Sequence, residues 1–176
     1  MSKRDFVYCP YCGRLLEPRP LANQVRPACS QCGFVHFHNP KVAVIGLLEE
    51  AGQLLLVRRG INPGKGLWAL PGGYMDSGEM PEEALRRELH EELGVAAEVG
   101  ELLAIYPMVV RGGSDEVSQG IVLAYRARLL DPTAIPVAQD DVAEVRWYAP
   151  ADLPTDLAFA STHDQLRRWQ QIRMES

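Results

Sequence analysis

Short apolar runs recur along most of the chain and predict strands. Residues 42–48 and 54–58 are apolar runs joined by the turn sequence EEAGQ, which predicts a hairpin of two buried strands. In residues 99–107 and 120–130, apolar residues alternate with polar or small ones, as expected for half-buried strands. The run EVRWYAP predicts a last strand, so most of the central chain is expected to form a sheet.

Residues 81–93 have helical spacing instead. Pro81 suits the first position of a helix, and Gly94 suits the position just after its end. Met80 would then be the N-cap, where a polar side chain is usual, so we expect this helix to lack about 1 kcal/mol of capping stabilisation. An apolar stripe at i, i+4 and i+8 would pack on the sheet. It consists of Ala84, Leu85, Leu89 and Leu93.

A second helix is predicted over residues 161–174. Because the strands follow one another with few intervening helices, the pattern predicts an α+β fold in which helices flank a mixed sheet. The chain has 176 residues, of which 47% are hydrophobic and 23% charged, which suits one main domain with a small appendage. No apolar run approaches the roughly 20 residues that span a bilayer, and the first ten residues lack the apolar core of a signal peptide. We therefore expect a cytoplasmic protein without a membrane partner.

All four cysteines lie near the start of the chain, in two C-x2-C pairs that are each followed by glycine. Two residues between cysteines let a tight turn aim both sulfurs at one point, and two such turns predict a closed, structural Zn²⁺ site. Two disulfides or four free thiols are the alternatives, which a chain without a secretion signal does not favour. The segment is similar to a zinc ribbon, expected over residues 1–38, with Asn39-Pro40 as the turn before a domain at residues 39–176. The expected zinc ligands are Cys9, Cys12, Cys29 and Cys32.

The net charge of the chain is −5, which lacks the basic footprint of a protein that binds duplex nucleic acid. Arg14, Arg19 and Arg26 of the ribbon are scattered and have no clear set of stacking aromatic residues around them. A nucleic-acid partner is therefore not expected. An anionic substrate would have to be bound locally, by arginines or by metal ions.

Glu88, Glu91 and Glu92 stand at i, i+3 and i+4, so three carboxylates share one face of the predicted helix, opposite the leucine stripe. A solvated helix surface is the ordinary explanation for such glutamates. Two further features favour a metal site. The predicted strand WALPGGYM brings a glycine-rich loop next to the helix, and Arg87 could return to pair with Glu79 and hold that loop. Clustered oxygen ligands of this kind suit Mg²⁺ or Mn²⁺.

The same stretch resembles the Nudix box in every fixed position. Gly73 is followed after five residues by Glu79 and after seven more by the run RELHEELGV, residues 87–95. The resemblance implies an α/β/α sandwich and hydrolysis of a nucleoside diphosphate linked to another moiety, with Mg²⁺ or Mn²⁺ as the cofactor. It implies that Glu79 and Arg87 form an orienting ion pair. The implied metal ligands are the Gly73 carbonyl oxygen and the carboxylates of Glu88, Glu91 and Glu92.

The resemblance does not fix the general base or the substrate contacts. Glu91 and Glu92 are candidates for the base, as is Glu144 outside the box, with Glu116 a weaker competitor. Arg58 and Arg59, at the end of the second predicted strand, could bind a phosphate, with solvated surface as the alternative. Tyr106 could stack on a base, although a half-buried strand position is its more common role.

A ribbon in front of a Nudix box resembles the zinc-ribbon Nudix hydrolases, which include ADP-ribose, NADH and FAD pyrophosphatases. The run LLAIYPMVVRGG after the box lacks the proline- and aromatic-rich signature of the NADH enzymes, so ADP-ribose or FAD is the favoured substrate. Two alternatives stay open: a Nudix domain used only to bind nucleotides or nucleic acid, and an RNA 5′-end hydrolase targeted by its ribbon. The resemblance also implies that the protein could form a homodimer.

Overall fold

The computed structural model describes residues 6–111 and 117–174, which fall into two compact units, Met1–Asn39 and Pro40–Ser176. Glu116, the weaker candidate for a general base, lies outside the described residues. Within those described ranges, no helix is long and apolar enough to cross a membrane.

The first unit is small and built around a two-stranded antiparallel hairpin, β1 (Glu17–Leu21) and β2 (Gln24–Ala28). Ala22 and Asn23 form its turn with φ of 46° and 64°, the two positive values that a type I′ hairpin turn requires. The apolar centre of the unit is small for independent folding. It consists of buried Cys9, Leu16 and Cys29, with Phe34 packed against them.

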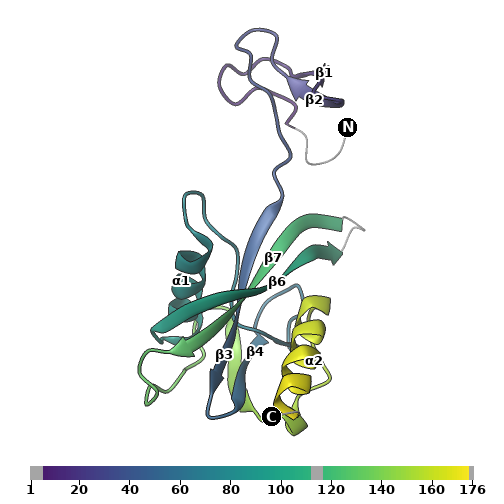
Figure 1. The fold of residues 1–176 in the computed structure, drawn as a ribbon. Helices are drawn as coiled ribbons and strands as arrows, with labels where there is room; N and C mark the ends of the chain where they lie inside the picture. The colour runs from purple at the N-terminus through teal and green to yellow at the C-terminus, as the bar shows by residue number, and fades with distance from the viewer. Residues whose placement is uncertain (1–5, 112–116, 175–176) are drawn as a thin grey trace. The chain divides into compact units, whose positions relative to one another are not determined.

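The second unit contains one mixed sheet of six strands (Figure 1). Its order is β5-β4-β3-β7-β6, and β8 pairs with β4. The pairing of β3 with β7 is parallel and every other strand pairing of this sheet is antiparallel. The strands are β3 (Lys41–Glu50), β4 (Gln53–Arg59), β5 (Trp68–Ala69), β6 (Ala97–Arg111), β7 (Val117–Leu129) and β8 (Val142–Tyr148).

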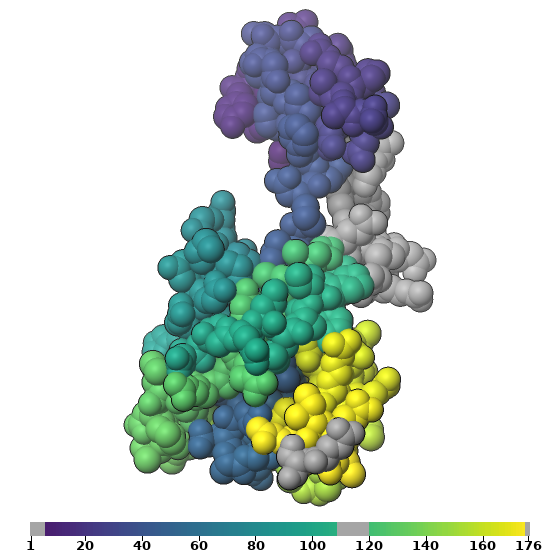
Figure 2. Space-filling view, in the orientation of Figure 1, coloured from purple at the N-terminus to yellow at the C-terminus, as the bar shows by residue number. Residues whose placement is uncertain are grey.

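Both faces of the sheet are covered, as β4 shows most clearly. Successive side chains of a strand point to opposite faces. Leu55 and Val57 belong to the core under helix α1 (Pro81–Leu93), whereas Leu54 and Leu56 belong to the core under helix α2 (Ala160–Met174). The continuous apolar run of this strand therefore reflects burial on both sides, and the predicted α/β/α sandwich is confirmed. In the space-filling view, the yellow atoms of α2 adjoin those of β6 (Figure 2).

Helix α1 begins and ends where the sequence predicts. Gly94 has the left-handed conformation, with φ of 67°, and its N–H donates to His90 O at 2.9 Å. Met80 has no side chain that could cap the helix, but the carboxylate of Glu83 accepts a hydrogen bond from the Met80 N–H at 3.1 Å. This contact is one half of a capping box and offsets part of the expected loss.

Two predicted elements have different lengths in the structure. The short strand expected from WALPGGYM is only Trp68–Ala69, because the chain reaches Gly72 with φ of +134°, a conformation that interrupts a strand. Strands β6 and β7 are longer than predicted, because residues 108–111 of β6 also pair with β7, with Arg111 opposite Val117. A 3₁₀ turn, η1 (Pro150–Asp152), follows β8.

Leu89→Ala tests the packing of α1 on the sheet. Leu89 has no solvent exposure, so truncation should lower the free energy of unfolding by about 2–5 kcal/mol. Leu130→Ala is the control because Leu130 is 63% exposed, and its effect should stay within about 0.5 kcal/mol. All three tryptophans lie in this unit, so urea unfolding followed by tryptophan fluorescence reports on it alone. Equal losses in the two variants would contradict the described packing.

Candidate active site and cysteine cluster

The glycine-rich loop before α1 is held against β3 by main-chain hydrogen bonds. Gly72 lies so close to this strand that a Cβ atom at its position would be 2.2 Å from the carbonyl oxygen of Val44. No side chain fits there, and φ of +134° is also reserved for glycine. The loop is therefore fixed relative to the sheet. Its bonds run from Gly46 N–H to Pro71 O, from Val44 N–H to Gly73 O and from Met75 N–H to Val42 O, at 2.9, 2.9 and 3.0 Å.

Glu92 connects α1 to this loop from inside the protein. Its side chain is buried, with only 4% of the residue exposed, and its Oε2 accepts a hydrogen bond from the Gly72 N–H at 2.8 Å. Burial raises the pKa of Glu92 to about 8, with added repulsion from Asp141 and Glu88, whereas the Gly72 N–H and Arg59 oppose the rise. A carboxylate held among fully buried leucines is a costly arrangement that invites a compensating positive charge.

Gly73 and Glu88 lie in close contact beside the Gly72–Glu92 hydrogen bond. A Cβ atom at Gly73 would be 2.6 Å from an oxygen of the Glu88 carboxylate, so glycine leaves the space that this carboxylate occupies. Burial raises the pKa of Glu88 as well, partly offset by Arg87. The loop therefore carries the Gly73 carbonyl oxygen and lies against the Glu88 carboxylate oxygens. The Gly73 carbonyl already accepts a hydrogen bond from the Val44 N–H.

Arg87, which lies in α1, is the cation that binds the acidic residues of the box. Its guanidinium binds Glu79 through two hydrogen bonds of 2.7 and 2.9 Å, so the expected partners lie together. It also donates to Glu88 at 2.8 Å and to Glu91 at 3.0 Å, and to the carbonyl of Tyr74 in the loop. One arginine of α1 thus binds three carboxylates and holds the loop against the helix.

The three box glutamates differ in exposure. Glu92 is buried, Glu88 is largely covered, and the side chain of Glu91 is 48% exposed. Their oxygens do not converge on one point: in the described parts of the chain, the cysteines form the only group of three or more His, Cys, Asp or Glu residues whose ligand atoms all lie within 4.8 Å. The solvent exposure of the three carboxylates therefore increases from Glu92 in the core to Glu91 at the surface.

Asp141 is a nearby acid that the sequence reasoning missed. Its charge contributes to the raised pKa values of both Glu88 and Glu92, and its carboxylate lies 4.0 Å from the Arg59 guanidinium. The segment DDVAEVRWY was considered only for Glu144. The signal that could have found Asp141 is strand register, because Val142 pairs with Arg59 at the end of β4.

Glu144 and Arg58 bind each other, and none of their described contacts involves a residue of the box. Arg58 donates to Glu144 at 3.1 Å, and Arg146 donates to its other oxygen at 2.7 Å. Both guanidinium groups lie over the ring of buried Trp68, at 5.5 and 5.6 Å from its centroid. Both oxygens of Glu144 are therefore already bound by arginines.

Tyr106 joins β6 to α2. Its hydroxyl donates to Asp164 at 2.9 Å, and its half-buried ring packs against two apolar clusters. Burial and the Asp164 charge raise the pKa of Tyr106 to about 12. These contacts describe a packing residue, and a role in base stacking is still only a prediction.

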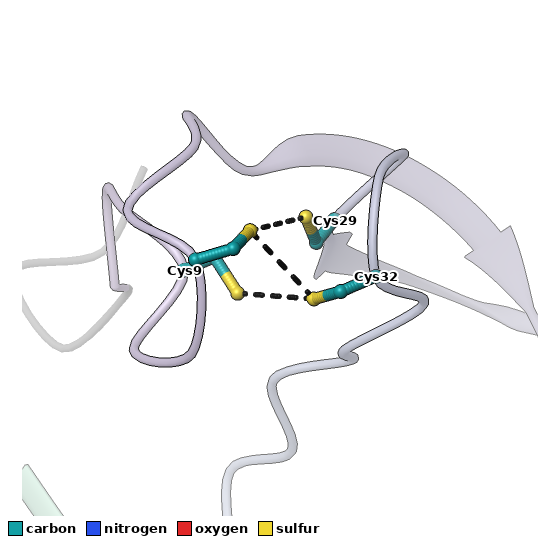
Figure 3. A group of neighbouring side chains, drawn as sticks. Cys9, Cys29 and Cys32 are labelled. Carbon is teal, nitrogen blue, oxygen red and sulfur yellow. Dashed lines mark hydrogen bonds between the residues drawn. The ribbon is translucent and has the colours of Figure 1, made fainter.

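The four cysteines form a cluster in the first unit with their sulfurs turned toward one another (Figure 3). Both turns use the same backbone bonds: the glycine after each pair donates its N–H to the first cysteine, Gly13 to Cys9 at 2.9 Å and Gly33 to Cys29 at 3.2 Å. The pKa of the Cys29 thiol is lowered to about 6, chiefly by the backbone N–H of Cys32, whereas hydrogen bonds from the neighbouring thiols raise the pKa of Cys32 to about 12. Thiolates are the form that binds metals.

The spacing of the sulfurs fits a tetrahedral metal site better than disulfides. The pairs Cys9–Cys32, Cys12–Cys29 and Cys12–Cys32 are 3.4, 3.5 and 3.8 Å apart, and all four thiols are free. A tetrahedron with Zn–S bonds of about 2.3 Å has edges of about 3.8 Å, whereas a disulfide bond is about 2.05 Å long.

Glu79→Gln tests the ion pair with Arg87. Arg87 is the largest cause that lowers the pKa of Glu79 to about 2, from a usual value of 4.5. A lowered pKa stabilises the folded state above pH 4.5, and this stabilisation is lost as the pH falls toward 2. Wild type should therefore unfold at higher urea than Glu79→Gln at neutral pH, and the difference should shrink between pH 4.5 and 2. A difference that is constant over this range would contradict the pair.

The family of this chain is shown by its similarity to known proteins. A family model described as the NUDIX domain matches residues 37–170. The crystal structure of a Nudix hydrolase from Nitrosomonas europaea has a TM-score of 0.84 and 30% identity, and covers 97% of this chain and 94% of its own. The ADP-ribose pyrophosphatase of Methanocaldococcus jannaschii is 47% identical over 68 residues, which is 39% of this chain and 40% of that protein. The CTP pyrophosphohydrolase of Escherichia coli is 40% identical over 70 residues, 39% of this chain and 52% of that protein.

The chain thus spans about half or less of these two enzymes, and their names do not decide its substrate. The domain match and the full-length structural likeness agree with the sandwich fold and with the box at residues 73–95. The chain belongs to the Nudix hydrolase family.

Proposed function

We propose that this protein is a Mg²⁺-dependent hydrolase of the pyrophosphate bond in a nucleoside diphosphate linked to another moiety, with ADP-ribose or FAD favoured and NADH less suited. The single observation that carries the proposal is the burial of the Glu92 and Glu88 carboxylates against the Gly72–Gly73 loop. A domain that only binds nucleotides has no need for buried carboxylates among the leucines of its core. Mn²⁺ would serve in place of Mg²⁺.

The donor set suits a hard divalent cation. Glu88, Glu91, Glu92 and the carbonyl of Gly73 offer only oxygen, which is the preference of Mg²⁺ and Mn²⁺. Glycine at positions 72 and 73 lets the loop lie directly against β3 and against the Glu88 carboxylate. Bound Mg²⁺ would neutralise pyrophosphate oxygens and lower the pKa of a coordinated water.

The other residues of the box hold this arrangement in place. Arg87 and Glu79 fix the loop on the helix, so that Gly73 lies against the Glu88 carboxylate. Glu92 is anchored by the Gly72 N–H and leaves its second oxygen free of that bond. Glu91, the most exposed of the three glutamates, is the best placed to accept a proton from an attacking water.

Substrate contacts are proposed at the end of β4. Arg58 has a side chain 42% exposed, so its guanidinium can also meet an anion from solvent. Arg59 is largely enclosed and suits a supporting role better than a direct phosphate contact. A relative named for ADP-ribose supports a diphosphate-linked substrate, whereas one named for CTP supports a nucleoside triphosphate. The alternative of RNA 5′-end processing would give the ribbon a targeting role.

For the cysteine cluster we propose one structural Zn²⁺, bound by Cys9, Cys12, Cys29 and Cys32. The sulfur spacing and the repeated turn geometry support this proposal. Four protein ligands leave no open position for water, so this metal would stabilise the first unit and take no part in hydrolysis.

Glu92→Gln tests the catalytic proposal. Wild type with Mg²⁺ should cleave ADP-ribose or FAD into two phosphomonoesters, and faster than NADH, CTP or RNA with a 5′-triphosphate. The variant should lose at least about 100-fold in turnover, because even outer partners of a metal site are worth roughly 10- to 100-fold. Products are measured by chromatography.

Glu98→Gln is the matched control, since Glu98 is exposed and pairs only with Arg128 among its described ion pairs. It should keep wild-type turnover. Failure of wild type to cleave any substrate in the panel would overturn the enzyme proposal, and near-normal turnover of Glu92→Gln would overturn the assignment of the site.

Cys29→Ser tests the zinc proposal. Elemental analysis of the purified protein should find about one zinc per chain in wild type and almost none in the variant, because three ligands hold a structural zinc poorly. Gln31→Ala changes the same turn without removing a ligand and should retain the metal. Zinc-free wild-type protein with a folded first unit would refute the proposal.

A further inference from the structure

We propose that the first unit carries a binding site for single-stranded nucleic acid, formed by Arg19, Arg26 and Phe37 beside one another on its hairpin. The site belongs to a different unit from the Nudix box and does not depend on the proposed hydrolysis. It would give the protein a second binding activity, in which the first unit holds an anionic strand whatever substrate the second unit cleaves.

Arg19 and Arg26 lie directly opposite each other in the hairpin of β1 and β2 (Figure 1). Residues that are opposite each other in an antiparallel pair share one face of the sheet, with Cβ atoms about 4.5–5.5 Å apart, and like charges in such a pair destabilise it. Two arginines that are scattered in the sequence therefore share one small surface. An anion bound there would relieve their repulsion.

No acid of the first unit balances these two charges. Among the described residues, neither Arg19 nor Arg26 takes part in an ion pair. The Nε atom of Arg26 is buried and has no hydrogen-bond partner within the same part of the chain. Glu17, two positions before Arg19 in β1, is the single acid of residues 6–39. The guanidinium groups thus keep donors that an anionic ligand could satisfy.

Phe37 provides an aromatic surface next to these arginines. The segment after the second cysteine turn runs beside β2, since the His36 N–H donates to the Pro27 carbonyl at 2.8 Å. The guanidinium carbon of Arg26 lies 4.6 Å from the centroid of the Phe37 ring, which is a cation–π contact. Phe37 is nevertheless 55% exposed, so much of its ring remains open to a second planar group.

An exposed ring beside unbalanced arginines fits a single-stranded nucleic acid better than other anionic macromolecules. Unpaired bases stack on aromatic rings and on guanidinium planes, and arginines bind the phosphates of the same strand. The bases of a duplex are stacked on one another and cannot use the ring. An acidic peptide carries charge without a planar group for each charge. The site therefore predicts a preference for unpaired RNA or DNA.

The distribution of charge along the chain agrees with this partner. The net charge of −5 describes the whole chain and argues against a protein that binds nucleic acid over its entire surface. Residues 6–39, however, contain three arginines, one glutamate, and no lysine or aspartate. The expectation that nucleic acid is not a partner thus rests on an average that the acidic second unit dominates.

Fluorescence anisotropy of the full-length protein with a labelled oligouridine of about 12 nucleotides tests the site. A 5′-hydroxyl end leaves this RNA without a pyrophosphate bond for the second unit. Arg19→Gln/Arg26→Gln should weaken binding and reduce the slope of log affinity against log salt by about 1.4, because each phosphate contact of a single strand contributes about 0.7. Arg14→Gln is the matched control, since Arg14 has the same charge in the same unit but donates to Gln31 at 3.2 Å. It should leave the slope unchanged.

Phe37→Ala tests the stacking contact separately. Loss of one stacked base should weaken RNA binding about 5- to 100-fold without a change in the salt slope, whereas Phe37→Tyr keeps an aromatic ring and should keep the affinity. Amide NMR spectra show whether each variant retains the fold of the first unit. If Phe37→Ala unfolds this unit, the surface variant Arg19→Gln/Arg26→Gln decides the question alone.

Three results would overturn the proposal. Wild type does not bind the oligouridine, or Arg19→Gln/Arg26→Gln has the affinity and slope of Arg14→Gln, or polyglutamate or duplex RNA displaces the label as readily as unlabelled oligouridine does. None of these results affects the proposed hydrolysis, which uses the box. Failure of wild type to hydrolyse any substrate would in turn leave this binding site standing.

Discussion

The hydrogen bond between the buried Glu92 carboxylate and the Gly72 N–H is the contact on which the site depends. It joins helix α1 to the loop in front of it at a point where both are packed on the sheet. The helix can bear this buried acid because Leu85, Leu89 and Leu93 on the same element are fully buried and anchor it. Apolar packing thus provides the free energy that keeps an unfavourable carboxylate in place.

One arginine and two glycines allow the acidic side chains of this region to lie close to the loop. Arg87 donates hydrogen bonds to Glu79, Glu88 and Glu91. Gly72 and Gly73 lack the Cβ atoms that would otherwise meet the Val44 carbonyl and the Glu88 carboxylate. The loop can therefore lie directly against β3 and against the Glu88 carboxylate.

Features set by local sequence were predictable, and features set by strand register were not. The bounds of α1 follow from Pro81 and Gly94, and the Arg87–Glu79 contact spans eight residues along one loop and helix. The contact of Asp141 with Arg59 depends instead on how β8 pairs with β4, and no local pattern distinguishes Asp141 from Glu144, three residues later. The bond of Tyr106 to Asp164, 58 residues away, was not predictable either, because it depends on how α2 packs against β6.

The two units obtain their stability in different ways, which bears on how each can contribute to function. The second unit has an apolar core on both faces of its sheet, so it can hold buried acids and still remain folded. In the described part of the first unit, the buried apolar cluster consists of Cys9, Leu16 and Cys29, so a metal bound by the cysteines would be the unit's main stabilising interaction. A residue that is both core and ligand cannot be replaced without losing both roles. Substitutions at Arg58, Glu144 and Arg146 are therefore expected to leave the second unit folded, because the sheet that carries them is already stabilised by its packing with α1 and α2.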